Sequence, residues 1–309
     1  MGMVTIVMTT YNGEKYVSEQ IESILSSSYQ DIQLWIYDDG SKDDTVSILK
    51  AYEKRYPEKI RVHQNAINRG VTLNFLQAVC QTTSDFIMFS DQDDVWKPEK
   101  IALTLKRMRH MESQRGNDTP LAVFTDAVVV DQDLHVIHDS FFQSGHLNPK
   151  HTDLPHLLME NKLIGCTVMI NSALRRILQS HRLPKEAKYH DWWLALVATS
   201  FGNIGFVSAG TLLYRQHSNN VVGNTGFFAY VKNRITSLQT QKQSLLALQR
   251  QAAEFGIIYQ NLLNEDKQRI ITQFASLDKE GVIRRRILII RYGFFKTGIL
   301  RNIGLMLII

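Results

Sequence analysis

Cysteine is scarce in this chain, which has two cysteines among its 309 residues. Cys80 and Cys166 lie far apart and form no Cys-x-x-Cys pair, which argues against a disulfide framework and against a zinc–thiolate site. Such cysteine usage is compatible with a reducing cytosol. Met1 to Thr10 contain no basic n-region, so we expect no secretory signal. No Gly-rich P-loop occurs and no Ser-His-Asp arrangement stands out, so neither of those two kinds of site is indicated.

Acidic residues are absent from Gly281 to Ile309, whereas six cations occur there: Arg284, Arg285, Arg286, Arg291, Lys296 and Arg301. Because the whole chain carries a formal charge of +5, these six leave the rest close to neutral. A nucleic-acid-binding protein more often spreads basic residues over a face of its fold, so we expect no nucleic-acid partner. A tail rich in both basic and large apolar residues indicates an anionic membrane surface or a partner protein.

The tail also lacks an uninterrupted apolar run of the roughly 20 residues that a transmembrane helix needs. The stretch from Ile287 to Ile309 is apolar but holds three cations and three glycines: Arg291, Lys296, Arg301, Gly293, Gly298 and Gly304. The cations do not fall on one side of a helical wheel, and the glycines could divide the stretch into shorter helices. We expect peripheral attachment to the cytoplasmic leaflet of the cell membrane. The alternative is a helix packed on the main domain or on another subunit of a homo-oligomer.

The whole chain is 44% hydrophobic and 21% charged, which is typical of a globular protein. In its N-terminal half, short apolar runs alternate with helical patterns. Strands are expected at Val4–Met8, Ile32–Tyr37, Ile60–His63 and Phe86–Phe89. Helices are expected between them, at Glu14–Ser28, Asp43–Tyr56 and around Leu73–Val79. This β-α-β-α order predicts an α/β fold with a mainly parallel sheet flanked by helices.

The character of the chain changes after Gly223. Leu121–Val130 is still typical of a buried strand, but Phe227–Leu263 is Gln-rich with a helical period, and Ile270–Ile309 is helical and increasingly apolar. We therefore expect one domain over residues 1–222 and a C-terminal helical region over residues 223–309, which could bind membrane or form oligomers.

Polar segments follow three of the predicted strands, at Thr9–Gly13, Asp38–Asp44 and Ser90–Asp94. In sheets of this kind the ligand lies beyond the carboxyl ends of the strands. The last segment places Asp91, Asp93 and Asp94 in one loop, where their repulsion costs free energy unless a cation neutralises it. Ligands of this type suit Mg²⁺ or Mn²⁺. The alternative is a solvated acidic turn that caps the helix expected near Pro98.

Several other polar residues are candidates for ligand contacts. Asp38 and Asp39 could accept hydrogen bonds from a base or ribose, although their turn is also typical of a helix cap. Tyr11 could stack on a nucleobase or simply pack. Asn68 could position the ligand, together with Arg69 and with Gly70, which could instead serve a turn. Gly165-Cys166-Thr167 could line an acceptor site, with Cys166 as a buried small side chain.

Four of these motifs occur in chain order at strand ends: Val4–Gly13, Asp38–Ser41, Asn68–Gly70 and Ser90–Asp94. Together they resemble the family 2 glycosyltransferases, which have the Rossmann-like GT-A fold, over about residues 3–220. Three longer motifs are similar to a narrower group, the bacterial rhamnosyltransferases of cell-wall and capsular polysaccharide: Phe89–Trp96, His190–Trp193 and Tyr214–Asn220.

The resemblance implies roles for particular residues. Thr9, Tyr11 and Asp39 match positions that contact the nucleoside, and Asp38 and Asn68 join them as donor-binding candidates. Asp91 and Asp93 match the Asp-x-Asp pair that binds donor and metal, with Asp93 as the direct metal ligand. His217 matches a histidine that binds the metal or the diphosphate, although a lone histidine is often structural.

Asp191 matches the carboxylate that acts as general base. Inverting transfer needs one base on the face opposite the leaving diphosphate, which removes the proton from the acceptor hydroxyl. His190, Trp192 and Trp193 could give this carboxylate a perturbed environment and a sugar-stacking wall. Asp191 could instead cap a helix whose tryptophans pack in the core.

The resemblance implies an inverting, Mn²⁺- or Mg²⁺-dependent transfer of L-rhamnose from dTDP-β-L-rhamnose to a lipid-linked saccharide in bacterial cell-surface polysaccharide biosynthesis. One alternative is transfer of a hexose or N-acetylhexosamine from a UDP-sugar. Another is a non-catalytic scaffold that binds nucleotide-sugars, against which the presence of Asp91, Asp93 and Asp191 argues. The Gln-x-x-Arg-Trp motif of processive synthases is absent, which indicates addition of one or a few sugars.

Overall fold

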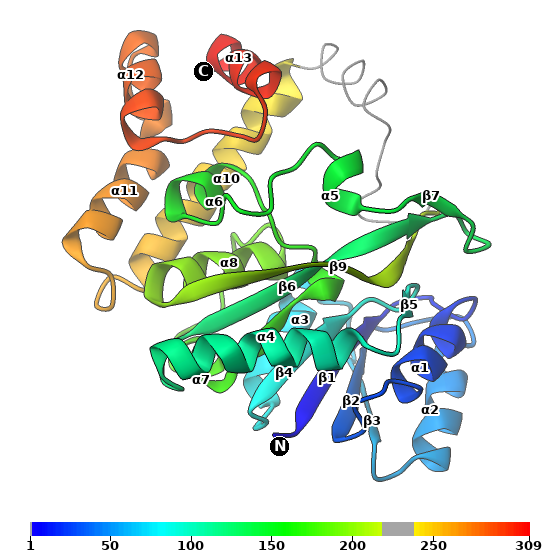
Figure 1. Ribbon diagram of the computed structural model, residues 1–309. Helices are drawn as coiled ribbons and strands as arrows, with labels where there is room; N and C mark the ends of the chain where they lie inside the picture. Colours follow the sequence, from blue (N-terminus) through cyan, green and yellow to red (C-terminus); the bar gives the residue numbers. More distant parts are fainter. Residues whose placement is uncertain (1, 218–237) are drawn as a thin grey trace.

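The structure is a computed structural model that describes residues 2–217 and 238–309 (Figure 1). The predicted domain boundary near residue 222 therefore falls outside the described residues, as do Ser218, Asn219 and Asn220 of the last motif. The long helix predicted from Phe227 is described only from Leu238 onward.

The N-terminal half forms the parallel part of the sheet, as predicted. Its strands are β1 (Val4–Thr10), β2 (Ile32–Asp38), β3 (Ile60–Gln64) and β4 (Phe86–Ser90), which pair in parallel in the order β3-β2-β1-β4. The helices between them are α1 (Val17–Leu25), α2 (Thr45–Arg55) and α3 (Val71–Gln81). Since all four strands run the same way, their carboxyl ends meet at one edge.

The sheet continues beyond β4 with mixed strand directions. Its strands there are β5 (Val95–Trp96), β6 (Leu121–Val130), β7 (Val136–His138), β8 (Met169–Asn171) and β9 (Asn203–Arg215). β8 is antiparallel to β4 and β6, whereas β9 is parallel to β6 and antiparallel to the short β5. The β5–β9 pairing returns the end of β9 to the loop that follows β4, where the acidic cluster lies.

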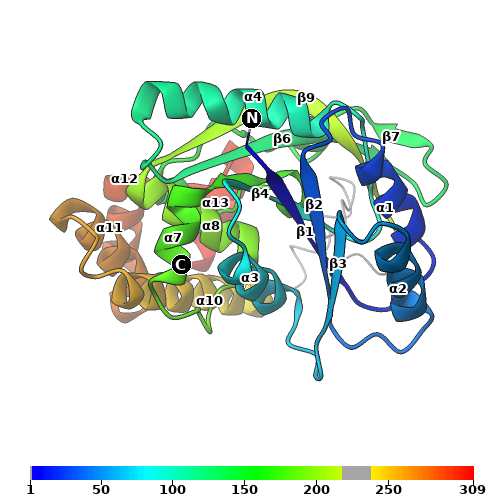
Figure 2. The ribbon, with the colours of Figure 1, turned by 90° about the horizontal axis from the view of Figure 1, so that it is seen from below.

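Helices cover both faces of this sheet. They are α4 (Lys100–Arg115), α5 (Phe141–Ser144), α6 (Leu154–Met159), η1 (Gly165–Thr167), α7 (Ser172–Gln179) and α8 (His190–Phe201). Figure 2 shows α4 on one side of the sheet and α3, α7 and α8 on the other. Every residue of β1, β4 and β6 is buried, which explains why these strands are almost continuously apolar.

The predicted C-terminal helical region contains α10 (Leu238–Ile258), α11 (Glu265–Ala275), η2 (Leu277–Lys279), α12 (Val282–Tyr292) and α13 (Ile299–Ile308). Gly293 and Gly298 have positive φ angles of 73° and 90° and separate α12 from α13, as predicted. The predicted break at Gly304 is wrong, because a single glycine inside a helix costs only about 1 kcal/mol and α13 continues through it. No helix in the described part of the chain is both long and apolar enough to cross a membrane.

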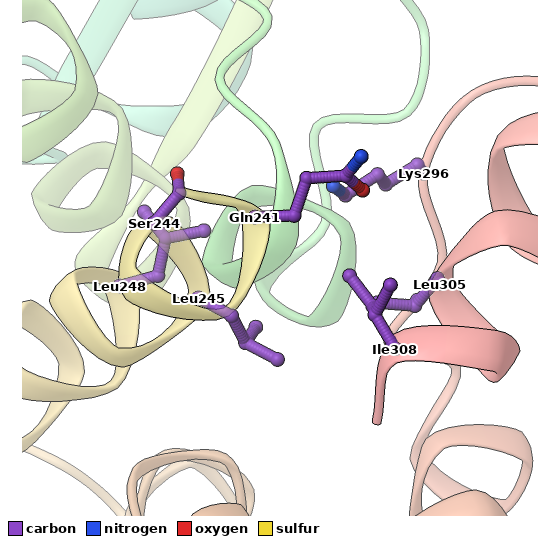
Figure 3. Close-up of a pocket in the computed structure, with 7 residues that line it drawn as sticks. All are labelled: Gln241, Ser244, Leu245, Leu248, Lys296, Leu305 and Ile308. Atoms are coloured by element: carbon purple, nitrogen blue, oxygen red, sulfur yellow. The ribbon is translucent and has the colours of Figure 1, made fainter. Parts of the chain in front are cut away.

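One face of the C-terminal tail packs on the rest of the protein. Figure 3 shows Leu305 and Ile308 of α13 across a small cavity of about 70 Å³ from Leu245 and Leu248 of α10. Leu305 and Ile308 are buried. The sequence offered packing on the main domain or on another subunit as an alternative to membrane attachment. The face of α13 that carries Leu305 and Ile308 packs within the chain, on α10.

Candidate active site

A cleft of about 560 Å³ opens at the carboxyl ends of β1, β2 and β4. Seven of the nine predicted site residues line it: Thr9, Tyr11, Asp39, Asn68, Asp91, Asp93 and Asp191. Further lining comes from residues 161–165 and from the start of α8. The segments that follow β1, β2 and β4 therefore meet in one cavity, as the strand-end argument predicts, and residues from more than sixty positions further along the chain join them.

Asp39 organises the part of the cleft that is predicted to bind the donor. Its Oδ1 accepts hydrogen bonds from Asn65 Nδ2 and from the Arg69 N–H, both at 2.9 Å. Its Oδ2 accepts one from the Gly70 N–H at 2.9 Å. Gly70 has a φ of +80°, a conformation that favours glycine, and it immediately precedes α3. Asp39 therefore fixes the Asn68–Gly70 loop while it lines the cavity.

The structure argues against the prediction that Asp38 contacts the donor. Its side chain is fully buried and does not line the cleft. Asp38 Oδ1 accepts from the Thr10 and Ser41 hydroxyls, and Oδ2 accepts from the Gly40 and Ser41 N–H groups. The carboxylate is thus used to close the turn after β2, which is the structural alternative that the sequence left open, whereas the N-cap of α2 is Asp44.

Tyr11 lies at an open part of the cleft, with 46% of its surface exposed. The Tyr11 N–H donates to Gln92 Oε1 at 2.8 Å, and Gln92 Nε2 donates to the Tyr11 carbonyl at 3.1 Å. This reciprocal pair fixes the backbone of Tyr11 to the acidic loop while the ring stays available for a ligand.

The acidic loop takes part in two clusters of polar groups, one of two residues and one of three. Asp93 Oδ2 lies 2.8 Å from Nε2 of His217, a residue that does not itself line the cleft. Atoms of Asp91, Asp94 and Cys166 lie within 4.8 Å of one another. Burial and then the nearby Asp94, Asp93 and Asp191 raise the pKa of Asp91 well above its usual range. Negative charge in this loop is therefore costly without a cation.

The residues present fit a divalent cation that prefers oxygen ligands. Buried Oδ2 of Asp94 has no hydrogen-bond partner, and burial followed by Asp93 raises the pKa of Asp94 to about 7. Cys166 does not belong to such a site, because burial raises the pKa of its thiol and Mn²⁺ and Mg²⁺ favour oxygen. Asp91 and Asp93, which face the cleft, are the ligands that the geometry favours.

Asp191 lies in the first turn of α8 and lines the cleft. It is 8% exposed, and burial raises its pKa to about 7, although hydrogen bonds with Trp192, Asn161 and Gly165 oppose the shift. A Cβ on Gly165 would lie 3.0 Å from the His190 ring and 3.6 Å from Asp191, so a larger residue there would press on the His190 side chain. A buried carboxylate with a pKa near neutrality is suited to proton transfer.

The sugar-stacking wall predicted for the two tryptophans is wrong. Trp192 and Trp193 are buried, and their indole N–H groups donate to the Leu157 carbonyl and, at 3.3 Å, to the Tyr259 hydroxyl. Neither residue lines the cleft. The aromatic lining comes instead from other elements, namely from Phe141, Tyr189 and Tyr214.

Sequence reasoning missed much of the remaining lining, which includes Phe141, Leu147, Asn161, Lys162, Leu163, Ile164 and Tyr189. Most of these residues lie in irregular segments or in the short α5, where no periodic pattern marks them. The buried Asp126 accepts a hydrogen bond from the Phe141 N–H at 3.1 Å and so holds α5 against β6. An isolated aspartate within an apolar strand was the available signal.

Comparisons with known proteins agree with this geometry. Residues 5–114 match the family model described as glycosyl transferase family 2. The chain is 29% identical over 240 residues to the dTDP-rhamnosyl transferase RfbG of Shigella flexneri, with 73% of this chain and 77% of that protein covered.

Solved structures of low identity show the same fold. S. aureus TarS 1-349 in complex with UDP-GlcNAc has a TM-score of 0.56 and 17% identity over 88% of this chain and 71% of its own. A mannosyltransferase from Pyrobaculum calidifontis, in complex with GDP-Man and Mn²⁺, has a TM-score of 0.56 and 16% identity over 99% of this chain and 84% of its own. The predicted GT-A fold is thus confirmed, and residues 5–114 of the chain are similar to the family 2 glycosyltransferases.

Proposed function

We propose that this glycosyltransferase transfers L-rhamnose from dTDP-β-L-rhamnose, with inversion, to a lipid-linked saccharide during bacterial cell-surface polysaccharide assembly. The observation that carries the choice of donor is the similarity to a dTDP-rhamnosyl transferase over 77% of that protein's length. The strand ends from Thr9 to Asp93 would form the donor-side wall of the cleft, and the lining residues from Phe141 to Asp191 would form its acceptor-side wall.

The donor side would hold the nucleotide. Tyr11 offers an exposed ring on which a base can stack, and Asp39 offers an acceptor carboxylate at the base of the cleft. Asp91 and Asp93 would hold a divalent cation, Mn²⁺ or Mg²⁺, which neutralises the charge that develops on the departing diphosphate. His217 contacts Asp93 and would orient it.

Asp191 would act as the general base. The acceptor hydroxyl attacks the anomeric carbon while the bond from that carbon to the diphosphate oxygen breaks, and Asp191 accepts the hydroxyl proton. Attack from the face opposite the diphosphate inverts the configuration, so a β-linked donor gives an α-L-rhamnoside. The pKa of about 7 leaves this carboxylate basic yet partly ionised at neutral pH.

The donor is tested by measuring kcat/KM for dTDP-rhamnose, UDP-glucose, UDP-galactose and UDP-N-acetylglucosamine with a shared lipid-linked acceptor. We expect dTDP-rhamnose to exceed each UDP-sugar at least about tenfold, the effect of a few pocket contacts. TarS in complex with UDP-GlcNAc favours the alternative, and thymine and uracil present the same hydrogen-bonding edge to Asp39. A higher kcat/KM for a UDP-sugar would overturn the choice of rhamnose.

The membrane attachment predicted for the tail is also part of the proposal. α12 and α13 lie at the same end of the molecule, and Arg286 Nε donates to the Met306 carbonyl at 3.1 Å (Figure 1). Their tail surface is defined by exposed apolar residues that range from 50% to 80% exposed: Val282, Ile283, Ile287, Ile290, Ile299, Leu300, Ile303 and Leu307. Arginines accompany them and no acidic residue does, which is the composition that anionic lipid attracts.

We expect the full chain to co-sediment with vesicles of phosphatidylcholine and phosphatidylglycerol and to bind pure phosphatidylcholine more weakly. Serine substitution of Ile283, Ile287, Ile299 and Leu300 together should reduce this binding at least about tenfold, because apolar burial supplies much of the affinity. Serine at Ile257 and Leu262, which are also exposed, is the matched control. Undiminished vesicle binding by the fourfold variant would contradict the attachment. A shift from dimer to monomer would instead assign the tail surface to a second copy of the chain.

A further inference from the structure

Glu160 lies in a buried ionic cluster that joins the middle of the chain to its C-terminal tail. It is 8% exposed and pairs with Lys162 and with Arg301 of α13. Glu160 Oε2 also accepts a hydrogen bond from the Thr297 N–H at 2.9 Å, and Lys162 Nζ donates to the Thr297 hydroxyl at 2.6 Å. The Lys162 side chain is fully buried and that of Arg301 is 20% exposed.

The cluster adjoins the wall of the cleft that lies beside Asp191. Asn161 directly follows Glu160, lines the cleft and forms a side-chain hydrogen bond with Asp191. The Asn161 amide also closes on Leu163, with its Oδ1 3.0 Å from the Leu163 N–H and its Nδ2 3.0 Å from the Leu163 carbonyl. Gly165, at the end of this wall, contacts Asp191 through its N–H. A short path of contacts therefore leads from α13 to Asp191.

This path matters because the wall has no regular structure of its own. Residues 160–164 lie between α6 and η1 and belong to no helix or strand. A segment without ladder or helical hydrogen bonds depends on side-chain contacts for its position. Removing Glu160 leaves the buried charge of Lys162 uncompensated, and removing Arg301 leaves Glu160 with Lys162 as its remaining ion-pair partner. Either change weakens the contacts that hold the segment, so the segment would rearrange.

We propose that Glu160 and Arg301 are a positioning pair, through which the C-terminal helices hold the acceptor-side wall against Asp191. This inference rests on the proposed function to the extent that it takes Asp191 as the base. The donor side is held separately, by the hydrogen bonds of Asp39 to Asn65, Arg69 and Gly70. Loss of the pair should therefore affect acceptor use and spare donor binding.

The test compares Glu160→Gln, Arg301→Gln, Arg301→Lys and the double glutamine variant in the full chain. Arg269→Gln is the matched control, since Arg269 forms an exposed ion pair with Asp266 elsewhere in the C-terminal helices. We expect the glutamine variants to raise the acceptor KM or lower kcat at least tenfold, with the donor KM changed less than twofold. Arg301→Lys keeps the positive charge and should retain most of the activity. The double variant should be no less active than the poorer single variant, because each single variant already breaks the ion pair between Glu160 and Arg301.

Hydrogen exchange of the backbone over residues 160–167 gives a readout that does not depend on catalysis. Exchange there should accelerate in Arg301→Gln and not in Arg269→Gln, while exchange over residues 68–70 stays unchanged. Arg301→Gln serves if Glu160→Gln fails to fold, because Arg301 is nearer the surface. Unchanged exchange in the wall, or equal changes in the donor and acceptor KM values, would overturn the positioning role. A wild-type chain with no transfer activity, yet with the expected exchange pattern, would overturn the proposed function and leave this coupling standing.

Discussion

Asp191→Asn should reduce kcat for sugar transfer by about 10²–10⁴-fold, the range that a general base contributes. Asparagine has nearly the same shape and still offers an oxygen to the Trp192 N–H, which Asp191 Oδ1 binds at 2.7 Å. It cannot accept the hydroxyl proton. The donor KM should change little, because the substitution keeps the shape of the side chain and leaves Tyr11 and Asp39, which are predicted to hold the nucleotide, unaltered.

The pH profile gives this prediction a second, independent readout. Burial raises the pKa of Asp191 to about 7, and the base works only as a carboxylate. The rate should therefore rise about tenfold per pH unit below that pKa and level off above it. A bound cation favours the carboxylate and would move the midpoint below 7 rather than above it. At saturating metal, which keeps Asp91 and Asp94 ionised, the residual rate of Asp191→Asn should lack this acid limb.

Asp118→Asn is the control, because it makes the same chemical change at a carboxylate that is 99% exposed and forms an ion pair with Arg176. It should match the wild type in rate and in pH profile. Transfer by Asp191→Asn at more than about a tenth of the wild-type rate would remove Asp191 from the role of base, given the size expected of general base catalysis.

The sequence was informative wherever burial imposes a pattern. β1, β4 and β6 are buried along their whole length, so their apolar runs marked the sheet, and the polar residues after β1 and β4 then had to gather at one edge. This is why Tyr11, Asp91 and Asp93 could be assigned to one cleft before the fold was seen.

Neighbouring residues with the same chemistry could not be separated in this way. Asp38 and Asp39 are adjacent carboxylates, yet Asp38 closes a turn and Asp39 lines the cleft. Which of the two faces the cavity depends on the backbone path at the end of β2, and no residue pattern encodes that path. Trp192 and Trp193 pose the same problem, because helix packing rather than composition decides that both point into the core.

The acceptor-side wall was unpredictable for a different reason. Its position depends on contacts between distant parts of the chain, such as the pair formed by Glu160 and Arg301. Charged residues of opposite sign are common, so pairing partners cannot be chosen without the fold. The same holds for the C-terminal tail. Its composition indicated an apolar and basic surface, but it could not show that Leu305 and Ile308 would pack on α10.

The metal site provides the second large expected effect. Chelation should abolish transfer, and Mn²⁺ or Mg²⁺ should restore it, because the departing diphosphate then regains its neutralising charge. Asp93→Ala should lower kcat at saturating metal by about 10²-fold or more, as removal of one stabilising contact in a transition state does. It should also weaken Mn²⁺ binding measured directly by electron paramagnetic resonance.

His217→Gln should act on metal affinity more than on the maximal rate. His217 Nε2 lies 2.8 Å from Asp93 Oδ2, and its ring stacks on Tyr16 with centroids 5.2 Å apart, so its orientation is set before any ligand arrives. Loss of such a supporting contact raises the half-saturating metal concentration by about 10–100-fold. Asp133→Asn, at an exposed carboxylate away from the cleft, is the control. If Asp93→Ala binds Mn²⁺ as tightly as the wild type does, Asp93 is not a ligand, and the cation must be held by Asp91 with the unpartnered oxygen of Asp94.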